Sequence, residues 1–568
     1  MRIALAQFDP VVGALDANAD EICQLTVLAK EQGADLVVFP ELALCGYPPL
    51  DLAVERWFIE ANQRAIEQLS ARLVLPAIVG HIGMPSSPAE LGWNAASLLD
   101  EGAIVATRAK CLLPTYDVFD EVRLFTRGGK NVPVVWRGHR LGISICEDLW
   151  GGVPAGEPGR YVQDPIAELV EGGIDLLINL SASPFSVGHP ARRATVVCEA
   201  ARKWSVPIVQ SNLVGATDDL IFDGQSIAVD ESGTFIERLP SFRAVVQTID
   251  LASSPRPSTA SSNACNADTP SNTPSSSTVF DASASECLDA LCHGLQLYMR
   301  KCGFEDVILG LSGGIDSAVV TALATLALGP RKVHAITMPS EYSSEGSWLD
   351  SRALATNLGI SLAEISIHDL VTTQRQLLQP HLGELGTSVT AQNLQARSRG
   401  LILMAHANQL GYLLLATGNK SELAVGYATL YGDMCGGLLP IGDLYKGQVE
   451  RLGRVLNLRL GAAIPEAIFA KAPSAELAPE QRDSDSLPPY PVLDPILESL
   501  IEAERGIEGT VATGTASRDV VESVAWMLAR AEHKRRQAPP ILRVSSRVFG
   551  RGRRFCIAAK PFPQRLDG

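Results

Sequence analysis

The stretch 307–317 reads V-I-L-G-L-S-G-G-I-D-S and constrains the fold more than any other part of the chain. An apolar run leads into its glycines, and an apolar, helix-favouring run follows at 318–328, which predicts a strand, a tight loop and a helix. Gly313 and Gly314 permit close approach to the backbone, and the amides and dipole of the first helical turn favour an anion. The stretch therefore predicts a phosphate-binding turn.

Asp316 places a carboxylate among these anion-binding groups, to which Ser312 and Ser317 add hydroxyl donors. A carboxylate at this position makes sense if Mg²⁺ bridges it to the phosphates. The stretch has neither the G-K-[ST] ending of a Walker A loop nor the G-x-G-x-x-G dinucleotide spacing. It resembles the S-G-G-x-D-S loop of the ATP pyrophosphatases, which adenylate a substrate and release pyrophosphate; the alternative is a ligand-free turn. The resemblance implies these ATP-binding residues: Gly310, Leu311, Ser312, Gly313, Gly314, Ile315, Asp316 and Ser317.

Composition limits the kind of protein that carries this loop. A chain of 568 residues is long enough for two to four domains. A net charge of -15 argues against nucleic acid or an anionic membrane as partner. The opening M-R-I-A-L-A-Q-F lacks signal-peptide features, no apolar run reaches membrane-spanning length, and the 11 cysteines contain no C-x-x-C. We expect a cytoplasmic protein with reduced thiols.

The chain is expected to contain two domains joined by a tether. Residues 1–250 alternate short apolar runs with amphipathic stretches, which predicts an α/β domain with strands at 3–6, 36–39, 77–80, 141–146, 176–180 and 208–210. Residues 251–280 are mostly rich in Ser, Thr, Pro and Asn, which is typical of a disordered tether. Residues 281–568 carry further strands at 333–338 and 412–417, which suggests a doubly wound (Rossmann-like) parallel sheet with ligands at the carboxyl ends of the strands. The stretches 471–495 and 534–554 are expected to be loops.

Three polar residues of the first half lie at or near the ends of apolar runs, where a sheet delivers side chains to a common edge. They are Glu41, Lys110 and Cys146; each alone has a structural or surface explanation. Together they resemble the nitrilase and amidase superfamily, which implies an αββα sandwich for this domain. In that family the cysteine attacks a carboxamide or nitrile carbon, the glutamate is the general base and the lysine stabilises the oxyanion. Glu121 resembles a further glutamate of the superfamily, with a surface charge as the alternative. The matching stretches are F-P-E-L at 39–42, K-C-L-L-P at 110–114 and C-E-D at 146–148.

The resemblance also implies which amide is cleaved. Tyr116 and Ser183 match positions that hold the amino acid end of the substrate in members that use glutamine. Those members commonly carry a lysine six residues after the serine, where this chain has His189. Arg192 or Arg193 could supply the positive charge instead.

The second half resembles NAD synthetase, and the joined chain resembles the glutamine-dependent form of that family. Besides the loop at 310–317, the matching stretches are 392–399, 417–422, 442–449, 473–477 and 533–540. The resemblance implies Mg²⁺ with ATP and no tightly bound organic cofactor. The implied roles are deamido-NAD binding by Asn393, Glu422 and Lys534, ATP contact by Thr417, metal binding by Asp316 and Glu422, and a position near the phosphates for Lys446.

A basic cluster near the end of the chain stands out against the acidic composition. It is expected to bind nucleotide phosphates or to form a subunit contact, although arginine runs also bind RNA or only solvate a surface. Its members are Lys534, Arg535, Arg536, Arg543, Arg547, Arg551, Arg553 and Arg554.

The preferred hypothesis is a two-site enzyme whose substrates are glutamine, ATP and deamido-NAD. Glutamine is hydrolysed at Cys146, and ammonia passes to the second site, where it displaces AMP from an adenylated nicotinate carboxylate and gives NAD. Relatives that make GMP or asparagine carry one of two other glutaminases. One kind needs G-x-C-x-G, which this sequence lacks, and the other needs a cysteine directly after the initiator Met, where this chain has Arg2. Two other hypotheses are a silent sensor of NAD precursors and a simple amidase fused to an unrelated domain. The family is oligomeric, so we expect a homo-oligomer.

Overall fold

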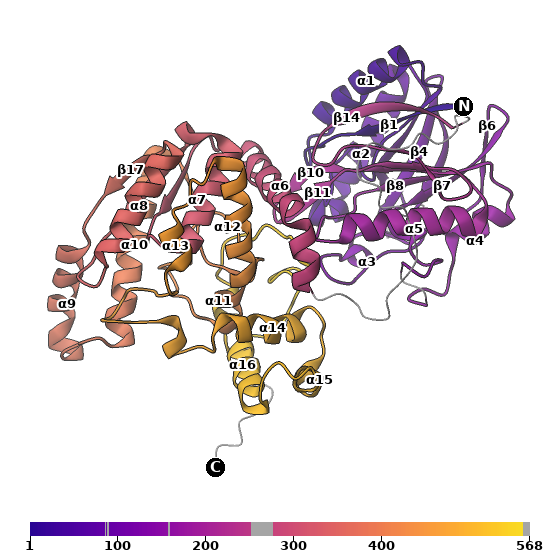
Figure 1. The fold of residues 1–568 in the computed structure, drawn as a ribbon. Helices are drawn as coiled ribbons and strands as arrows, with labels where there is room; N and C mark the ends of the chain where they lie inside the picture. The colour runs from indigo at the N-terminus through magenta and orange to yellow at the C-terminus, as the bar shows by residue number, and fades with distance from the viewer. Residues whose placement is uncertain (86, 88–89, 157–158, 252–275, 560–568) are drawn as a thin grey trace. The chain divides into compact units, whose positions relative to one another are not determined.

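The computed structural model describes residues 1–85, 87, 90–156, 159–251 and 276–559. The chain divides into two compact units, 1–273 and 274–568 (Figure 1). Most of the expected tether, residues 252–275, lies outside the described residues. Helix α6 (Ser276–Cys302) begins inside the range expected for the tether, so the helical part of the second unit starts earlier than the sequence suggested.

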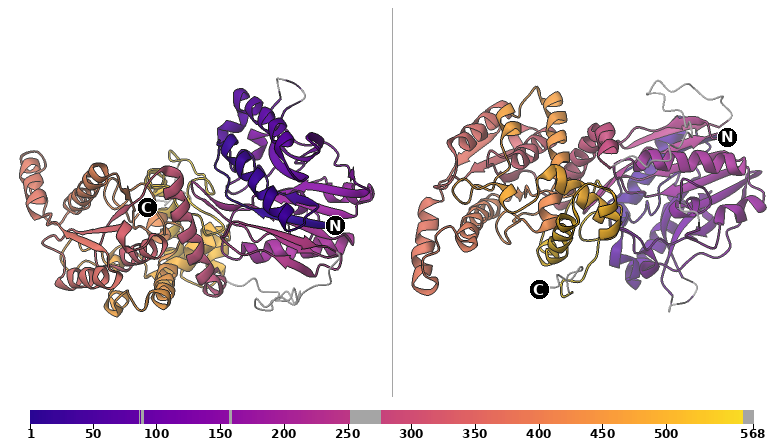
Figure 2. Two further views of the ribbon diagram at one scale, coloured as in Figure 1. Left: turned by 90° about the horizontal axis from the view of Figure 1, so that it is seen from above. Right: turned by 60° about the horizontal axis from the view of Figure 1, so that its bottom comes forward.

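Two six-stranded sheets form the centre of the first unit (Figures 1 and 2). In spatial order the first contains β14 (Val245–Asp250), β1 (Arg2–Gln7), β2 (Leu36–Val38), β3 (Ala77–Gly83), β4 (Trp93–Asp100) and β5 (Ala103–Ala109). The second contains β13 (Phe235–Arg238), β12 (Ile227–Val229), β9 (Ile208–Asn212), β8 (Leu176–Ser181), β7 (His139–Ile145) and β6 (Val134–Trp136). A separate hairpin is formed by β10 (Val214–Thr217) and β11 (Leu220–Asp223).

Alternation along the strands explains the layers. Ile3 and Leu5 of β1 face the second sheet, where they share a core with residues such as Ile178 of β8. Ala4 and Ala6, which point to the opposite face, pack with the helices α1 (Leu15–Glu31) and α2 (Arg56–Arg72). A third core joins the second sheet to α4 (Pro165–Glu171) and α5 (His189–Trp204). The αββα sandwich expected for the first domain is confirmed. Short helical segments are η1 (Leu50–Val54), α3 (Glu121–Leu124) and η2 (Cys146–Leu149).

The second unit contains a four-stranded parallel sheet in the order β17 (Ser361–Glu364), β16 (Val333–Thr337), β15 (Val307–Gly310) and β18 (Leu413–Leu414). The chain builds outward from β15 to β17 and then returns to place β18 on the other side of β15. The order therefore reverses beside β15, and the glycine loop follows that strand at the switch point where ligands bind. The doubly wound sheet is confirmed. The strand expected at 412–417 is short, because after β18 the chain continues only as an isolated bridge between Leu415 and Leu438.

The helices of the second unit pack on this sheet or on one another. They are α7 (Ile315–Leu328), α8 (Glu345–Leu358), α9 (His368–Leu382), α10 (Val389–Leu410), α11 (Lys420–Val425), α12 (Lys446–Leu460), α13 (Glu466–Ala470), α14 (Tyr490–Ile501), α15 (Gly506–Ala512), α16 (Arg518–Arg530) and α17 (Glu532–Arg535), with short turns η3 (Pro330–Lys332) and η4 (Asp483–Asp485). Helix α14 begins inside the stretch 471–495 that was expected to be a loop, because proline at its second position is compatible with a helix start. Helix α17 ends inside the second expected loop, 534–554. Across the described residues, no helix is long and apolar enough to cross a membrane.

Candidate active sites

The first site is built around a strained turn at the end of β7. Cys146 is the first residue of η2 and has a φ of 45°, a left-handed conformation that is rare for a residue with a side chain. Such strain is typical of functional turns. The thiol is buried, and the Ser181 hydroxyl at the end of β8 donates to its sulfur at 3.5 Å.

Glu41 and Lys110 lie beside this turn. The Lys110 Nζ is 2.8 Å from Glu41 Oε1, and both side chains are almost completely buried. The other oxygen of Glu41 accepts a hydrogen bond at 2.9 Å from the backbone N–H of Ala182, the residue after the serine that contacts the cysteine. The Asn94 amide donates to Glu41 at 2.7 Å. The structure thus brings Glu41, Lys110 and Cys146 into one cluster.

Glu121 belongs to the same cluster and is not a surface charge. Its carboxylate is buried, lies 2.8 Å from the Lys110 ammonium, and accepts the Tyr47 hydroxyl at 3.0 Å. One ammonium therefore faces two carboxylates. Burial raises the pKa of Glu121 to about 7, with Lys110 opposing the rise and Glu41 adding to it. The two carboxylates hold the Lys110 pKa well above its ordinary value against the effect of burial, so the lysine stays charged.

The thiol of Cys146 rests in its protonated form. Burial and the nearby Glu41 carboxylate raise the pKa of Cys146, and Lys110 only partly offsets them. A buried thiol of this kind becomes a nucleophile when a base removes its proton during attack. Glu41 can accept that proton, and Lys110 provides a fixed positive charge for an oxyanion.

Asp148, which the sequence reasoning did not single out, joins the segment that follows Lys110 to the strand that precedes Cys146. Its buried carboxylate accepts the backbone N–H groups of Cys111 at 2.9 Å and Leu112 at 2.8 Å, directly after Lys110. The second oxygen accepts the N–H of Ile145 at 3.1 Å, directly before the cysteine. The signal was present in the C-E-D stretch, but only the fold shows what this aspartate binds.

Tyr116 and Ser183 flank the cluster on separate elements. The Tyr116 hydroxyl donates to Glu147 at 2.9 Å, and the Tyr161 hydroxyl donates to the other oxygen of the same carboxylate at 2.9 Å. Glu147 is buried next to the cysteine in sequence, and burial raises its pKa. Ser183 is buried, and its backbone N–H donates to the Asn212 side chain at 3.0 Å.

The start of α5 does not place a lysine near this site. The His189 ring stacks on Trp150 with centroids 5.4 Å apart, and the Arg192 guanidinium lies 5.4 Å from the same ring. Arg193 is fully buried and binds both oxygens of Asp223. The earlier suggestion that Arg193 could supply the positive charge is therefore wrong, because its guanidinium is committed to the β10–β11 hairpin.

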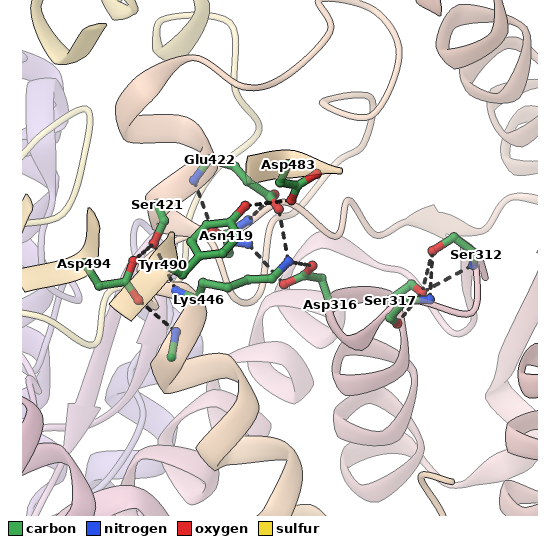
Figure 3. Close-up of polar contacts among 12 residues, drawn as sticks. Ser312, Asp316, Ser317, Asn419, Ser421, Glu422, Lys446, Asp483, Tyr490 and Asp494 are labelled. Atoms are coloured by element: carbon green, nitrogen blue, oxygen red, sulfur yellow. Dashed lines mark hydrogen bonds and ion pairs between the residues drawn. The ribbon is translucent and has the colours of Figure 1, made fainter. Parts of the chain in front are cut away.

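The second site contains the glycine loop. Gly313 has a φ of 78°, and a Cβ there would lie 2.3 Å from the carbonyl oxygen of Ser347, so the turn requires glycine. The hydroxyls of Ser312 and Ser317 lie 3.1 Å apart, and the Gly314 N–H donates to Ser312 at 3.3 Å (Figure 3). The two hydroxyls thus brace the loop at the start of α7.

This loop borders a cavity of about 340 Å³ at the carboxyl ends of the strands. All of the expected loop residues except Gly313 line it, together with Thr417, Glu422 and Lys446. Lys471 and Arg399 also line the cavity. Sequence reasoning missed both, although Arg399 ends the quoted stretch 392–399 and Lys471 lies two residues before the stretch 473–477.

Three charged side chains meet at one wall of the cavity. Figure 3 shows the Lys446 ammonium between the carboxylates of Asp316 and Glu422; it contacts Asp316 and lies 3.3 Å from Glu422. Asn419 donates to Asp316 at 3.1 Å and forms the capping box of α11 with Glu422. Burial and the adjacent Asp316 raise the pKa of Glu422 to about 8, with Lys446 opposing them.

The pair Asp316 and Glu422 is suited to an open magnesium site and not to a site in which the protein supplies every metal ligand. Among the described residues there is no group of three or more His, Cys, Asp or Glu side chains that could hold a metal. Mg²⁺ commonly binds one or two carboxylates and takes its other ligands from phosphates and water. Two carboxylates beside a phosphate-binding loop match that chemistry.

Asn393 and Lys534 meet on the segment 426–429. The Thr429 hydroxyl donates to Asn393 at 2.8 Å, while the Lys534 ammonium donates to the carbonyls of Gly426 and Ala428, at 2.7 Å each. Ala428 lines the cavity, whereas Asn393 and Lys534 are not among the residues that line it.

Several side chains of the basic cluster bind within the second unit. Arg535 is buried, pairs with Glu532 at 2.9 Å and donates to backbone carbonyls of α11. Arg536 also pairs with Glu532, and Arg547 pairs with Glu504 at 2.6 Å. Arg535 therefore has a structural role in this unit, while a phosphate or subunit contact of the other members of the cluster stays a prediction.

Comparison with known proteins matches each half of the chain to a family. The sequence model of the carbon-nitrogen hydrolase family matches residues 2–255, and that of the NAD synthase family matches residues 287–538. Two relatives are the glutamine-dependent NAD(+) synthetases of Synechocystis sp., 43% identical over 99% of both chains, and of Xanthomonas campestris pv. campestris, 41% identical over 98% of this chain and 97% of the relative.

A solved structure extends the comparison to three dimensions. It is glutamine-dependent NAD+ synthetase from Acinetobacter baumannii in complex with ADP, 34% identical, covering 98% of each chain with a TM-score of 0.74. Both halves of the chain are therefore accounted for by one family. The chain belongs to the glutamine-dependent NAD(+) synthetases.

Proposed function

We propose that the protein hydrolyses glutamine in its first unit and uses the released ammonia in its second unit to convert deamido-NAD to NAD. ATP activates the acceptor as an adenylated intermediate, and the other products are AMP, pyrophosphate and glutamate. The observation that carries the proposal is the coexistence of two sites in one chain. A buried cysteine, glutamate and lysine meet in one unit, and a phosphate-type loop borders a cavity in the other.

In the glutaminase reaction, Glu41 takes the proton of Cys146 as the sulfur attacks the carboxamide carbon of glutamine. Lys110 stabilises the oxyanion of the tetrahedral intermediate. Ammonia leaves when Glu41 returns the proton, and water then cleaves the thioester to give glutamate. Glu121 keeps the Lys110 ammonium in place. Tyr116, Ser183 and the region of His189 bind the amino acid end of glutamine.

In the synthase reaction, the nicotinate carboxylate of deamido-NAD attacks the α-phosphorus of ATP, and ammonia then displaces AMP. Residues 310–317 and Thr417 bind ATP, and Lys446 offsets phosphate charge. Asn393, Glu422 and Lys534 bind or shape the deamido-NAD site. Mg²⁺, held by Asp316 and Glu422, would offset the repulsion between the two polyphosphate substrates. The relative from Acinetobacter baumannii, whose structure contains ADP, supports nucleotide binding by this fold.

The two activities correspond to a glutaminase domain at 1–250 and a synthase domain at 281–568, joined through 251–280. The ranges matched by the two families support this division.

We also infer a cytoplasmic homo-oligomer. The cysteines of the described residues are free thiols, which suits a reducing compartment. Large apolar side chains are exposed on α9 and α10 and could pack against a second subunit. These side chains are Leu377, Leu382, Val389, Leu401 and Leu410. Light scattering, which measures the mass of the protein in solution, would test whether it is a homo-oligomer.

One assay tests the proposal. The protein is incubated with ATP, Mg²⁺, deamido-NAD and glutamine, and NAD, AMP, pyrophosphate and glutamate are quantified. We expect NAD and AMP in equal amounts, and NAD formation when ammonium replaces glutamine. Glutamate formation without any ATP consumption would favour a simple amidase instead, and binding without turnover would favour a sensor.

A further inference from the structure

The surroundings of Tyr116 suggest how the first site recognises the charged end of glutamine. This amino acid carries an ammonium and a carboxylate on its α-carbon, so a site that selects it needs opposite charges a short distance apart. Glu147 supplies a buried negative charge beside the nucleophile, and the hydroxyls of Tyr116 and Tyr161 fix both of its oxygens. The question is which cation receives the carboxylate.

The start of α5 is a poor source of that cation in this chain. His189 offers an imidazole and not an ammonium or a guanidinium, and Arg193 is bound to the buried Asp223. The Arg192 Nε and Nη2 donate to the carbonyls of residues 155 and 156 at 2.9 and 2.8 Å, which directs its guanidinium toward that loop.

Arg160 lies on the other side of the same tyrosine. Its guanidinium carbon is 4.0 Å from the centroid of the Tyr116 ring, and the side chain is exposed to solvent. The Tyr116 hydroxyl binds Glu147, and the Arg160 guanidinium stacks on the ring of the same tyrosine. Tyr116 therefore lies between an acidic group and a basic group. The positive charge of Arg160 also lowers the pKa of Glu147, which places the two within electrostatic reach.

We propose that Arg160 binds the α-carboxylate of glutamine. A guanidinium can donate two parallel hydrogen bonds to a carboxylate, and its stacking on Tyr116 restricts it before the substrate arrives. The inference rests on the glutaminase function proposed above and names a specificity residue for it.

The test compares Arg160→Gln and Arg160→Lys with Arg137→Gln in the full-length protein. Arg137 is a matched control, because its guanidinium also stacks on an aromatic ring, 4.9 Å from Trp136, in the same unit. Glutamine hydrolysis is measured under steady-state conditions. We expect Arg160→Gln to raise the KM for glutamine by roughly 10- to 100-fold with little change in kcat, since it removes charge-assisted hydrogen bonds. Arg160→Lys should recover part of the loss, and the control should match the wild type.

A second ligand separates substrate binding from a structural effect. The amide 4-aminobutanamide has the ammonium and the carboxamide but no α-carboxylate. It is assayed as a substrate or, where turnover is too slow, as a competitive inhibitor of glutamine hydrolysis. If Arg160 binds the carboxylate, the wild type and Arg160→Gln handle this amide equally, whereas equal losses for both ligands would overturn the proposal.

The remaining outcomes are also decisive. An unchanged KM in Arg160→Gln, or an increase seen only in His189→Gln or Arg192→Gln, would overturn the role of Arg160 and leave the glutaminase function standing. Absence of glutamine hydrolysis by the wild type would instead remove the proposed function and the inference together. NAD formation from ammonium, which uses the second site, should be the same in every variant and reports on the integrity of the protein.

Discussion

At the scale of single residues, the first site depends on a thiol that is reactive only in its own surroundings. Cys146 is buried, and burial raises its pKa, so the proposed chemistry would need Glu41 as base and Lys110 as counter-charge. We predict that Cys146→Ala abolishes NAD formation from glutamine, with a loss of at least about 10³-fold, and leaves synthesis from ammonium within about twofold of the wild type.

The measurement is NAD production with either nitrogen source under otherwise identical conditions. The matched control is Cys198→Ala, because Cys198 is an equally buried thiol in α5 of the same unit. Loss of the ammonium-dependent reaction in Cys146→Ala alone would contradict the division of labour between the two sites.

Glu121 provides a prediction about pH. The pKa of Glu121 is about 7 in the folded state, above its ordinary value of 4.5. The folded state therefore holds the proton more tightly than the unfolded state does, and protonation of Glu121 stabilises the fold. That stabilisation is complete below pH 4.5 and is lost as the pH rises through 7. Relative to Glu121→Gln, the wild type should therefore lose on the order of 1–3 kcal/mol of unfolding free energy between pH 4.5 and 8. Urea denaturation of both proteins at several pH values measures the difference, and parallel curves would contradict it.

Residue identity was easier to predict than residue contacts. Glu41, Lys110 and Cys146 lie at or near the ends of apolar runs, and this position together with the resemblance to the nitrilase and amidase superfamily suggested a common site. The partner of Lys446 could not be predicted, because Asp316 lies 130 positions away in the chain and only the sheet topology brings the two together. The same holds for Arg193, whose commitment to Asp223 depends on a hairpin that the sequence reasoning did not identify.

At the scale of secondary-structure elements, Asp148 ties the end of β5 to the turn after β7. Its three backbone hydrogen bonds fix the residues that adjoin Lys110 and Cys146. Asp148→Asn would point an amide N–H₂ at a backbone N–H, leaving a buried donor unsatisfied at a cost of about 1–3 kcal/mol. We predict at least a tenfold fall in the glutaminase kcat, a smaller change in KM, and a lower Tm for the first unit.

The control for this change is Asp230→Asn. Asp230 also accepts backbone N–H groups, from Ser232 and Thr234 at 2.9 Å each, but in the turn between β12 and β13. Both variants should form NAD from ammonium at the wild-type rate. A full glutaminase kcat in Asp148→Asn would show that this carboxylate does not position the reactive side chains.

Strands with continuous apolar runs were predictable, and strands with mixed faces were not. The runs at 3–6, 176–180 and 208–210 correspond to β1, β8 and β9, which are buried on both faces. Strand β4 is also buried but contains Asn94 and Ser97, while β5 is only partly buried, so neither shows a clean period. Lys110 follows β5, and its place in the sheet became visible only from the structure.

At the scale of the whole molecule, the proposal requires nitrogen released by one unit to reach the other. Ammonia that travels within one chain does not depend on protein concentration, whereas ammonia that escapes into solvent is diluted. Two variants separate these routes: we expect Cys146→Ala to retain the synthase and Asp316→Asn to retain the glutaminase. The second variant is expected to lose the synthase because Asp316 belongs to the cluster with Lys446 and Glu422 in the cavity beside the glycine loop.

We predict that an equimolar mixture of these variants, combined immediately before the assay with glutamine as nitrogen source, forms NAD at a rate per enzyme that falls on dilution. The rate per enzyme of the wild type should stay constant over the same range, because both sites belong to one chain. Each variant is also assayed alone to confirm that its retained site is active: Cys146→Ala with ammonium as nitrogen source, and Asp316→Asn with glutamine. A mixture that matches the wild type at every dilution would show that ammonia reaches the synthase through solvent, and internal transfer would then have to be abandoned.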